Sequence, residues 1–469
     1  MADFPVSILI VMLAGVGLLS LLLAPRVRTA DGFFSGLDEQ GAQPGLLTLT
    51  FSQVTTWIFA RSLLNAAILG YVYGIAGALA YAAYYGSFLT GWLIVDRLRY
   101  RHGVHNIQGF LVARFGRVGS GCFNLLISLR LLTEVFANLL VVGMVFGVAG
   151  SGAYTGAILA VSGLTLIYSM TGGLRASLRT DVLQMGLLMV LIVLLAGMAL
   201  LHPLFDWQGV LTSSPALNNP GWILLLVALL QVLSYPLHDP VMTDRGFIAD
   251  RDTTRRSFMH AFWLSALLIL AFGLLGVFAG LQGGEDKDVL LTLQRLLGTP
   301  AMLVLGLALV ISAASTLDST LSSASKLLVM DMGLGRPSAA SGRLAMALFA
   351  LGGLILVFVG SKDLFDAVAV SGTASLALTP VILFSILAGR EVARWSFVVN
   401  FAVALAGAVL YFLEKSGRLD LIGPLFGVEH SYSKLLVITV VILLSGLLLF
   451  ALGLKPRAQE RAPSVGMEP

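Results

Sequence analysis

A stripe of hydroxyl side chains marks one apolar segment of this 469-residue chain. Residues 311–331 read ISAASTLDSTLSSASKLLVMD, among surroundings made mostly of Leu, Ala, Val and Gly. The hydroxyls recur at i, i+3, i+4, i+7 and i+11, which places them on one face of a helix. They are Ser312, Ser315, Thr316, Ser319 and Ser323. Such a face can bind a hard cation such as sodium through its oxygens, or it can let two helices pack closely. The pattern alone leaves both interpretations open.

Two aspartates lie in comparable polar settings. Asp318 stands on the flank of the stripe, within the same apolar segment. A carboxylate at membrane depth is costly, so it indicates either a functional group or a polar partner for a neighbouring helix. Asp181 and Gln184 share one face at the start of another expected helix. An acid at that position is also typical of an ordinary helix start, where the helix dipole stabilises negative charge.

Two further segments combine polar residues with apolar surroundings. The span TTWIFARSLLNAAILGYVYG, residues 55–74, contains Arg61, Ser62 and Asn65. In residues 231–258, Pro236 and Pro240 predict a break close to the inner end of a helix. Broken helices in two halves of a membrane protein indicate a binding site near the middle of the bilayer.

The composition predicts an all-α polytopic membrane protein. Hydrophobic residues make up 57% of the chain and charged residues only 12%, whereas soluble domains carry about 25% charged residues. Because the basic residues cluster in expected loops, the net charge of +4 does not indicate nucleic acid binding. Cys122 is the only cysteine, which excludes a disulfide framework and a cysteine metal site. No catalytic motif such as HExxH or a phosphate-binding loop occurs, so we expect no enzyme and no catalytic residues.

Apolar windows long enough to cross a bilayer predict about thirteen membrane spans. We expect them near residues 5–25, 46–75, 76–96, 120–148, 153–171, 181–201, 221–244, 257–281, 299–328, 341–360, 364–389, 394–413 and 433–454. With the N-terminus outside, most of the 29 Lys and Arg residues fall in cytoplasmic segments. The excess of positive charge inside therefore predicts an external N-terminus and a cytoplasmic C-terminus. The lack of long outer loops favours a bacterial inner membrane over a eukaryotic plasma membrane.

Four segments resemble signatures of the sodium:solute symporter family, which includes sodium–glucose, sodium–proline, monocarboxylate and urea symporters. GGLRASLRTDVLQ resembles its GG-L-x-A…TD-x-x-Q signature, and STLDSTLSSASKLLVMD its S-T-x-D-S-x-L…S-S…D signature. DPVMTDRGFIADRD resembles the D-x-x-x-x-x-R…A-x-D loop of the family. LFDAVAVSGTASLALTPVIL resembles its L-F…P-P segment, although only Pro380 of the proline pair is present.

The resemblance implies a leucine-transporter-type architecture of two inverted five-helix repeats. The repeats are expected at residues 46–201 and 221–389. An accessory N-terminal helix and a cytoplasmic loop would occupy residues 1–45. Two C-terminal accessory helices would occupy residues 394–454, and residues 455–469 would form a cytoplasmic tail.

The resemblance also implies a sodium site between the first and the eighth core helices. In the family, backbone carbonyls come from the first helix and hydroxyls from the eighth. These ligands fall on the carbonyls of Ala60 and Leu63 and on the hydroxyls of Ser312, Ser315 and Thr316. Some members hold a second sodium ion with the aspartate of the TD motif, which Asp181 matches.

Arg61 departs from the small or acidic residues that the family often has at this position. It either binds an anionic group of the substrate in bidentate fashion or pairs structurally, for example with Glu134. The polar ligands of sugar transporters fall on Ala80 and Ala369, so we do not expect a sugar. The residues expected to line the substrate cavity are Arg61, Ser62, Asn65, Tyr235 and His238.

These features predict a sodium-coupled symporter that imports a small organic solute by alternating access. An amino acid, a monocarboxylate or a urea-like molecule are the candidate solutes, and the sequence does not choose among them. One alternative is a solute sensor that acts through a separate partner kinase, since the short tail leaves no room for a fused output domain. Another is a proton-coupled or sodium-independent carrier. Membrane lipid is the other expected partner, nucleic acid is not, and the oligomeric state stays open.

Overall fold

The computed structural model describes residues 6–38, 40–283, 288–359 and 371–456. Within these ranges the chain is helical and contains no strand, which confirms the all-α prediction. The first half comprises α1 (Val6–Leu23), α2 (Ala30–Ser35), α3 (Leu46–Trp57), α4 (Ala60–Ala83), α5 (Ser87–Asp96), α6 (Ile107–Phe146), α7 (Gly152–Gly172), α8 (Leu174–Leu200) and α9 (Trp207–Leu211). The second half comprises α10 (Pro220–Gln231), α11 (Tyr235–His238), α12 (Pro240–Gly246), α13 (Arg251–Gln282), α14 (Val289–Lys326), α15 (Ala339–Val359), α17 (Leu378–Pro380), α18 (Arg394–Lys415), α19 (Ile422–Phe426) and α20 (Ser431–Leu452).

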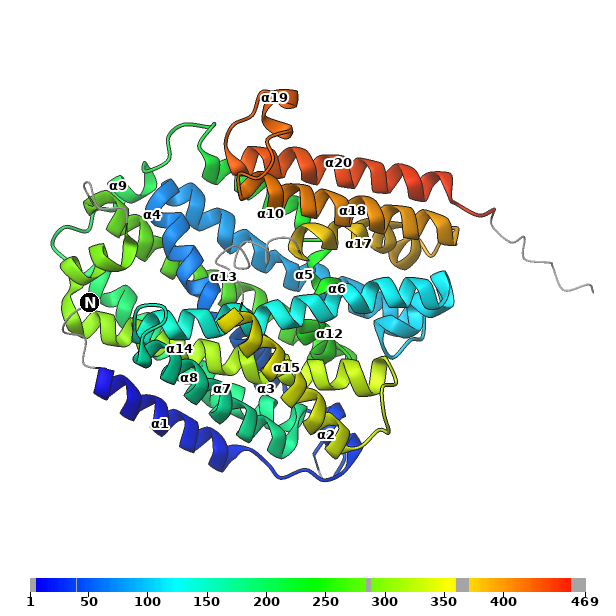
Figure 1. Ribbon diagram of the computed structural model, residues 1–469, viewed down its shortest axis with the longest axis horizontal. Coiled ribbons are helices and arrows are strands. Elements are labelled where there is room, and N and C mark those ends of the chain that lie inside the picture. The colour runs from blue at the N-terminus through cyan, green and yellow to red at the C-terminus, as the bar shows by residue number, and fades with distance from the viewer. Residues whose placement is uncertain (1–5, 39, 284–287, 360–370, 457–469) are drawn as a thin grey trace, which may run out of the picture.

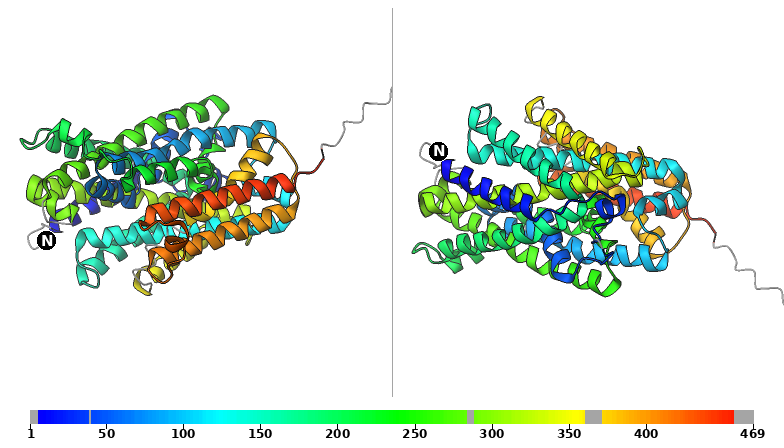
Figure 2. Two further views of the ribbon diagram at one scale, coloured as in Figure 1. Left: turned by 90° about the horizontal axis from the view of Figure 1, so that it is seen from above. Right: turned by 90° about the horizontal axis from the view of Figure 1, so that it is seen from below.

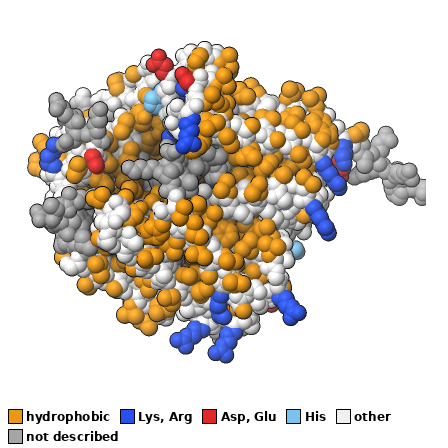
Figure 3. Space-filling model, viewed as in Figure 1, with side chains coloured by type: hydrophobic (Ala, Val, Ile, Leu, Met, Phe, Trp, Pro, Cys, Tyr) orange, Lys and Arg blue, Asp and Glu red, His pale blue; other side chains and the backbone are white. Residues whose placement is uncertain are grey.

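The long helices run roughly along the longest axis of the molecule and form one bundle (Figures 1 and 2). Helix α1 begins at one end of this bundle, and α20 ends at the opposite end (Figure 1). Hydrophobic side chains cover much of the visible face, and many Lys and Arg side chains gather at its right and lower rim (Figure 3). An apolar belt with charges at its ends is what a bundle that crosses a membrane presents to lipid and water. The chain is therefore a multi-pass membrane protein.

The expected number of about thirteen spans is not confirmed. Among the described residues, nine helices are long and apolar enough to cross a membrane, and three shorter apolar helices accompany them. One reason for the difference is that two of the expected spans, at residues 46–75 and 76–96, share the single apolar segment of residues 60–101 in this count. The backbone of that segment is not helical at Gly74, which has a φ of 64° that favours glycine, so α4 consists of two helical parts that meet near the expected boundary at residue 75.

Two helices are broken, one near the start of each half of the chain as divided above. Helix α3 ends at Trp57, and α4 begins at Ala60 after two residues, Ile58 and Phe59, whose backbone conformation is not helical. In the second half, α10 ends at Gln231, and two very short helices, α11 and α12, follow it. Asp239 begins α12 as its N-cap, because its Oδ1 accepts a hydrogen bond from the backbone N–H of Met242 at 3.1 Å. The break predicted from the prolines is therefore present, and a second break occurs without proline or glycine.

Helices α4 and α13 pack against each other with glycine at the points of closest approach. A Cβ atom added at Gly276 would lie 1.9 Å from the carbonyl oxygen of Ala67. A Cβ atom added at Gly70 would lie 2.1 Å from the carbonyl oxygen of Gly273. Small residues let two membrane helices bring their backbones into contact. This contact fixes the first core helix against α13.

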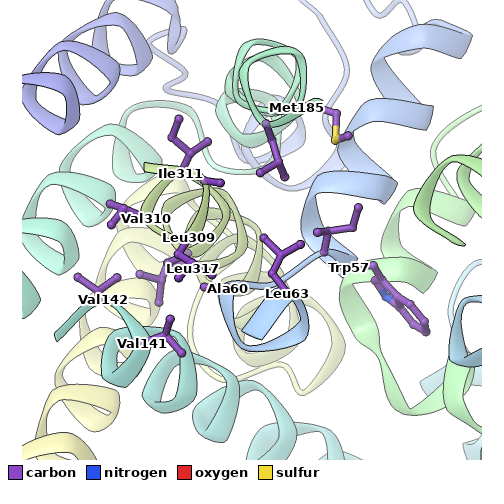
Figure 4. Packing of buried hydrophobic residues seen from close by; sticks show 14 of the residues in the cluster. Trp57, Ala60, Leu63, Val141, Val142, Met185, Leu309, Val310, Ile311 and Leu317 are labelled. Atoms are coloured by element: carbon purple, nitrogen blue, oxygen red, sulfur yellow. The ribbon is translucent and has the colours of Figure 1, made fainter. Parts of the chain in front are cut away.

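Helix α14 lies in the interior of the bundle and contacts α3, α4, α6, α7 and α8. Figure 4 shows it nearly end-on, with Ala60 and Leu63 of α4 on one side and Val141 and Val142 of α6 on another. The residues of α14 from Leu305 to Ser325 are all buried. The hydroxyl stripe is therefore enclosed by protein and does not face lipid.

Candidate ion and solute sites

The hydroxyl stripe of α14 meets the broken end of α3. The Ser312 hydroxyl donates a hydrogen bond to the carbonyl oxygen of Ile58, one of the two residues in the break. The Thr55 hydroxyl donates to the Ser315 Oγ at 3.0 Å. The Thr316 hydroxyl donates to the carbonyl oxygen of Ser312, one turn earlier in α14, at 2.9 Å. All these side chains are buried.

The chemistry of this contact suits a monovalent hard cation. Ser312, Ser315 and Thr316 each donate their hydroxyl proton to another protein oxygen. Their oxygens keep lone pairs that can bind a cation, and a carbonyl oxygen keeps a second lone pair after accepting one hydrogen bond. Among the described residues there is no group of three His, Cys, Asp or Glu side chains that could hold a metal ion. The donor set here consists of oxygens, most of them neutral, as sodium requires.

The carbonyl that meets the stripe is not one of the two that the family resemblance implied as sodium ligands. Ala60 and Leu63 belong to the first turn of α4, where backbone carbonyls accept hydrogen bonds within the helix. The carbonyl that meets the stripe is that of Ile58, two residues before Ala60. A helix that stops leaves its last carbonyls without helical partners. For this reason the end of α3 offers carbonyl oxygens, and the Trp57 carbonyl is used by the Tyr85 hydroxyl at 2.9 Å.

Asp181 lies next to this site but is held by an arginine. Its Oδ1 accepts a hydrogen bond from the Ser315 hydroxyl at 2.8 Å, and its Oδ2 accepts one from the Ser52 hydroxyl at 2.5 Å. The Nη2 of Arg245 lies 3.3 Å from the same Oδ2. Both Asp181 and Arg245 are completely buried. Arg245 directly follows the expected span at residues 221–244, yet the structure encloses it in the bundle.

Asp318, which lies on the flank of the stripe, contacts α7 and α8. Its Oδ1 lies 3.0 Å from the Ser169 hydroxyl, and its Oδ2 lies 2.7 Å from the Thr180 hydroxyl. These contacts join α14 to two neighbouring helices. Of the two interpretations of Asp318 from the sequence, the geometry therefore favours a polar partner for adjacent helices.

A cavity of about 270 Å³ lies beside the break between α3 and α4. Arg61, Ser62, Asn65 and Tyr235 line it. His238 is not among the lining residues. It is buried in the single turn of α11, with its ring 5.5 Å from that of Tyr235, and neither ring nitrogen has a hydrogen-bond partner among the described residues.

An ion triad beside the cavity was not predicted from the sequence. The Arg130 Nη1 lies 2.9 Å from the Glu134 Oε2, and its Nη2 lies 3.4 Å from the Asp239 Oδ2. All three side chains are buried, and Arg130 and Glu134 line the cavity. The pair on α6 could have been found, since its i, i+4 spacing in an apolar span is visible in the sequence. Glu134, which was considered as a partner for Arg61, is paired with Arg130.

The wall of the cavity is aromatic where it adjoins the break. The Trp57 ring contacts the rings of Tyr85 and Tyr235, at centroid distances of 5.9 Å and 5.5 Å. Tyr84 continues this wall, and its hydroxyl donates to the Gln231 Oε1 at 3.0 Å. A mostly apolar wall with a few polar groups is typical of a site that binds a small molecule.

An all-helical bundle whose two broken helices enclose a polar and aromatic cavity defines a membrane transporter for a small solute. The model of the family described as "Sodium:solute symporter family" matches residues 41–203. The resemblance that the sequence motifs predicted is therefore confirmed, and the chain is similar to sodium:solute symporters.

Two curated fungal proteins are similar to part of the chain. The urea active transporter of Saccharomyces cerevisiae is 24% identical over 230 residues, which cover 46% of this chain and 28% of that protein. The probable urea active transporter 1 of Schizosaccharomyces pombe is 29% identical over 150 residues, which cover 30% of this chain and 22% of that protein. The matched segments thus span well under half the length of these relatives.

Two solved structures share the fold over nearly the whole chain. One is a Na⁺-coupled sialic acid symporter in a substrate-bound, outward-open state, with a TM-score of 0.71 and 17% identity, covering 96% of this chain and 98% of that one. The other is a nucleobase-cation-symport-1 family transporter in a closed conformation with bromovinylhydantoin bound, with a TM-score of 0.59 and 12% identity, covering 92% of this chain and 94% of that one. At these identities the similarity shows the fold alone, which is of the leucine-transporter type.

Proposed function

We propose that the protein is a sodium-coupled symporter that imports a small organic solute by alternating access. The observation that carries this proposal is the contact between the hydroxyl stripe of α14 and the broken end of α3. That contact gathers buried oxygens at one point, and the same break forms a wall of the cavity through Trp57 and Phe59. An ion bound there would hold the two helices together and shape the solute site at the same time.

The sodium ion would lie between the Ile58 carbonyl and the hydroxyls of Ser312, Ser315 and Thr316. We propose that this carbonyl, at the end of α3, takes the role that the family resemblance assigned to Ala60 and Leu63. Moving one sodium ion down a membrane potential of about 100 mV releases ~2.3 kcal/mol. Since ~1.4 kcal/mol is a factor of ten, this alone would drive roughly forty-fold accumulation of a neutral solute.

Ion pairs close the bundle on the side that we assign to the cytoplasm. Lys326 at the end of α14 pairs with Asp244 on α12. The Arg251 Nε and Nη2 lie 2.6 Å and 3.0 Å from the two carboxylate oxygens of Asp96. Lys415, which lines the cavity, is by contrast the last residue of α18, at the opposite end of the bundle. This arrangement supports a state in which the cavity is closed toward the cytoplasm.

The remaining organisation follows from the same proposal. We place the two inverted repeats at residues 46–201 and 221–389, because each begins with one of the two broken helices. The charge distribution along the sequence supports an external N-terminus and a cytoplasmic C-terminus. In this arrangement the α3–α4 break and the α10–α12 break occupy equivalent positions in the two repeats, and both border the central site.

The cavity suits a small solute. Its volume of about 270 Å³ is slightly below the usual range for ligand pockets, ~300–1,000 Å³. An amino acid, a monocarboxylate or a urea-like molecule would fit. Arg61 lines the cavity and could bind a carboxylate group of the solute through two N–H donors.

Substituting Thr316 or Ser315 with alanine should raise the sodium concentration for half-maximal stabilisation by an order of magnitude or more. Each change removes one oxygen from a site with few ligands. The measurement is the rise in the thermal unfolding temperature of purified protein as sodium replaces choline, because a ligand that binds only the folded state stabilises it. This readout does not require the solute to be known.

Ser325→Ala provides the matched control for these variants. Ser325 is buried in the same helix but lies off the stripe, and its hydroxyl donates to the Ser322 carbonyl at 2.8 Å within its own turn. Its sodium dependence should equal that of the unmodified protein. Equal shifts at all three positions would assign the stripe to helix packing and contradict the proposed site.

A further inference from the structure

Arg245 lies next to Asp181, the residue at which the family resemblance implied a second sodium ion. Its side chain is fully buried and comes from α12, the short helix after the second break. Every nitrogen of its guanidinium has an oxygen partner. The partners are Ser52 Oγ at 2.6 Å, Val241 O at 3.0 Å, Ser319 Oγ at 2.8 Å, Ser177 Oγ at 3.2 Å and Asp181 Oδ2 at 3.3 Å.

Both carboxylate oxygens of Asp181 already accept hydrogen bonds. Oδ2 accepts from the Ser52 hydroxyl and from Arg245, and Oδ1 accepts from the Ser315 hydroxyl. A second sodium ion would have to share one carboxylate with a guanidinium a few ångströms away. Like charges repel strongly in a buried site, where the effective dielectric constant is low. The residues around Asp181 therefore do not fit a second sodium ion.

We infer that Arg245 is a built-in cation that takes the place of a second sodium ion, so that transport is coupled to one sodium ion only. This inference rests on the proposed function, because it names the stoichiometry of that function. The guanidinium links α12 to α3, α8 and α14, through Ser52, Asp181 and Ser319. The positive charge of Arg245 thus holds these four helices together permanently. A bound sodium ion would hold them together only while it is bound.

Removing the guanidinium should uncover a sodium site. The side chain of Asp181 and the hydroxyls of Ser52, Ser177, Ser315 and Ser319 would then face a space without a cation. One carboxylate with several hydroxyl oxygens is a donor set for a hard cation. Arg245→Ala is therefore expected to bind two sodium ions, whereas the unmodified protein binds one.

The experiment measures the number of radioactive sodium ions bound per purified protein molecule at saturation. Arg245→Lys keeps the positive charge and should bind one ion. Arg245→Ala combined with Asp181→Asn should also return to one ion. If Arg245→Ala alone does not fold, the number of ions bound by the unmodified protein and by Asp181→Asn still tests the inference. Arg117→Ala, at an exposed arginine of α6, is the control and should leave the number at one.

The outcomes separate the inference from the function on which it rests. Two ions bound by the unmodified protein, with one lost in Asp181→Asn, would overturn the inference while supporting sodium coupling. No ion bound by the unmodified protein would overturn the proposed function. Arg245→Ala would then still be expected to gain one ion that depends on Asp181, and absence of that gain in folded protein would overturn the inference as well.

Discussion

Replacing Arg130 with alanine is expected to lower the free energy of unfolding by about 3–5 kcal/mol, the usual cost of removing one partner of a buried ion pair. The change would leave the carboxylates of Glu134 and Asp239 buried without their cation. Because Asp239 is the N-cap of α12, the link between α6 and the second broken helix would be lost as well. The measurement is the thermal unfolding temperature of purified protein in the absence of sodium and solute.

Two comparisons make this test specific. Arg117→Ala removes an exposed arginine from the same helix and should change the unfolding temperature little. Arg130→Met combined with Glu134→Gln and Asp239→Asn removes all three charges, and it should recover most of the lost stability. If Arg130→Ala unfolds at the same temperature as Arg117→Ala, the triad does not hold α6 and α12 together.

Gly276→Ala is expected to disrupt the packing of α4 against α13. The new Cβ atom would lie 1.9 Å from the Ala67 carbonyl oxygen, and a backbone atom cannot turn aside as a flexible side chain can. Overpacking of a buried contact costs about 1–3 kcal/mol and sometimes more, and here the two helices must separate. We expect a lower yield of monodisperse protein on size-exclusion chromatography and a lower unfolding temperature.

Gly186→Ala is the matched control, because Gly186 lies in helix α8 with no atom within 4 Å of its added Cβ. It should leave yield and unfolding temperature unchanged or slightly improved, since alanine favours helix more than glycine does. Indistinguishable behaviour of the two variants would mean that α4 and α13 are not held at the separation described here.

The sequence was sufficient to predict the features that depend on local periodicity or on proline. The stripe of α14 was visible because a helix repeats its faces at fixed spacing, and the second break was visible through Pro236 and Pro240. The first break, at Ile58 and Phe59, contains neither proline nor glycine. Nothing local therefore marks it. The family resemblance implied carbonyl ligands at Ala60 and Leu63, whereas the ligand that we propose from the structure is the carbonyl of Ile58.

Contacts between distant parts of the chain could not be predicted in the same way. Arg130 and Glu134 are four residues apart, whereas Asp239 reaches them from another helix more than a hundred residues later. Arg245 follows an expected helix end and looks like a cytoplasmic loop residue, yet tertiary packing buries it against Asp181. Counting charges along a sequence assigns such an arginine to a solvent-exposed loop, because the count contains no information on burial.

The most direct test of sodium-coupled transport is uptake into proteoliposomes of a panel of labelled amino acids, monocarboxylates and urea. Each solute is offered with an inward sodium gradient, with equal sodium on both sides, and with sodium replaced by potassium. We predict that at least one solute accumulates above its external concentration only with the inward gradient, and that a sodium ionophore abolishes the accumulation. Uptake that is equal in sodium and potassium, or that follows a proton gradient instead, would contradict sodium coupling.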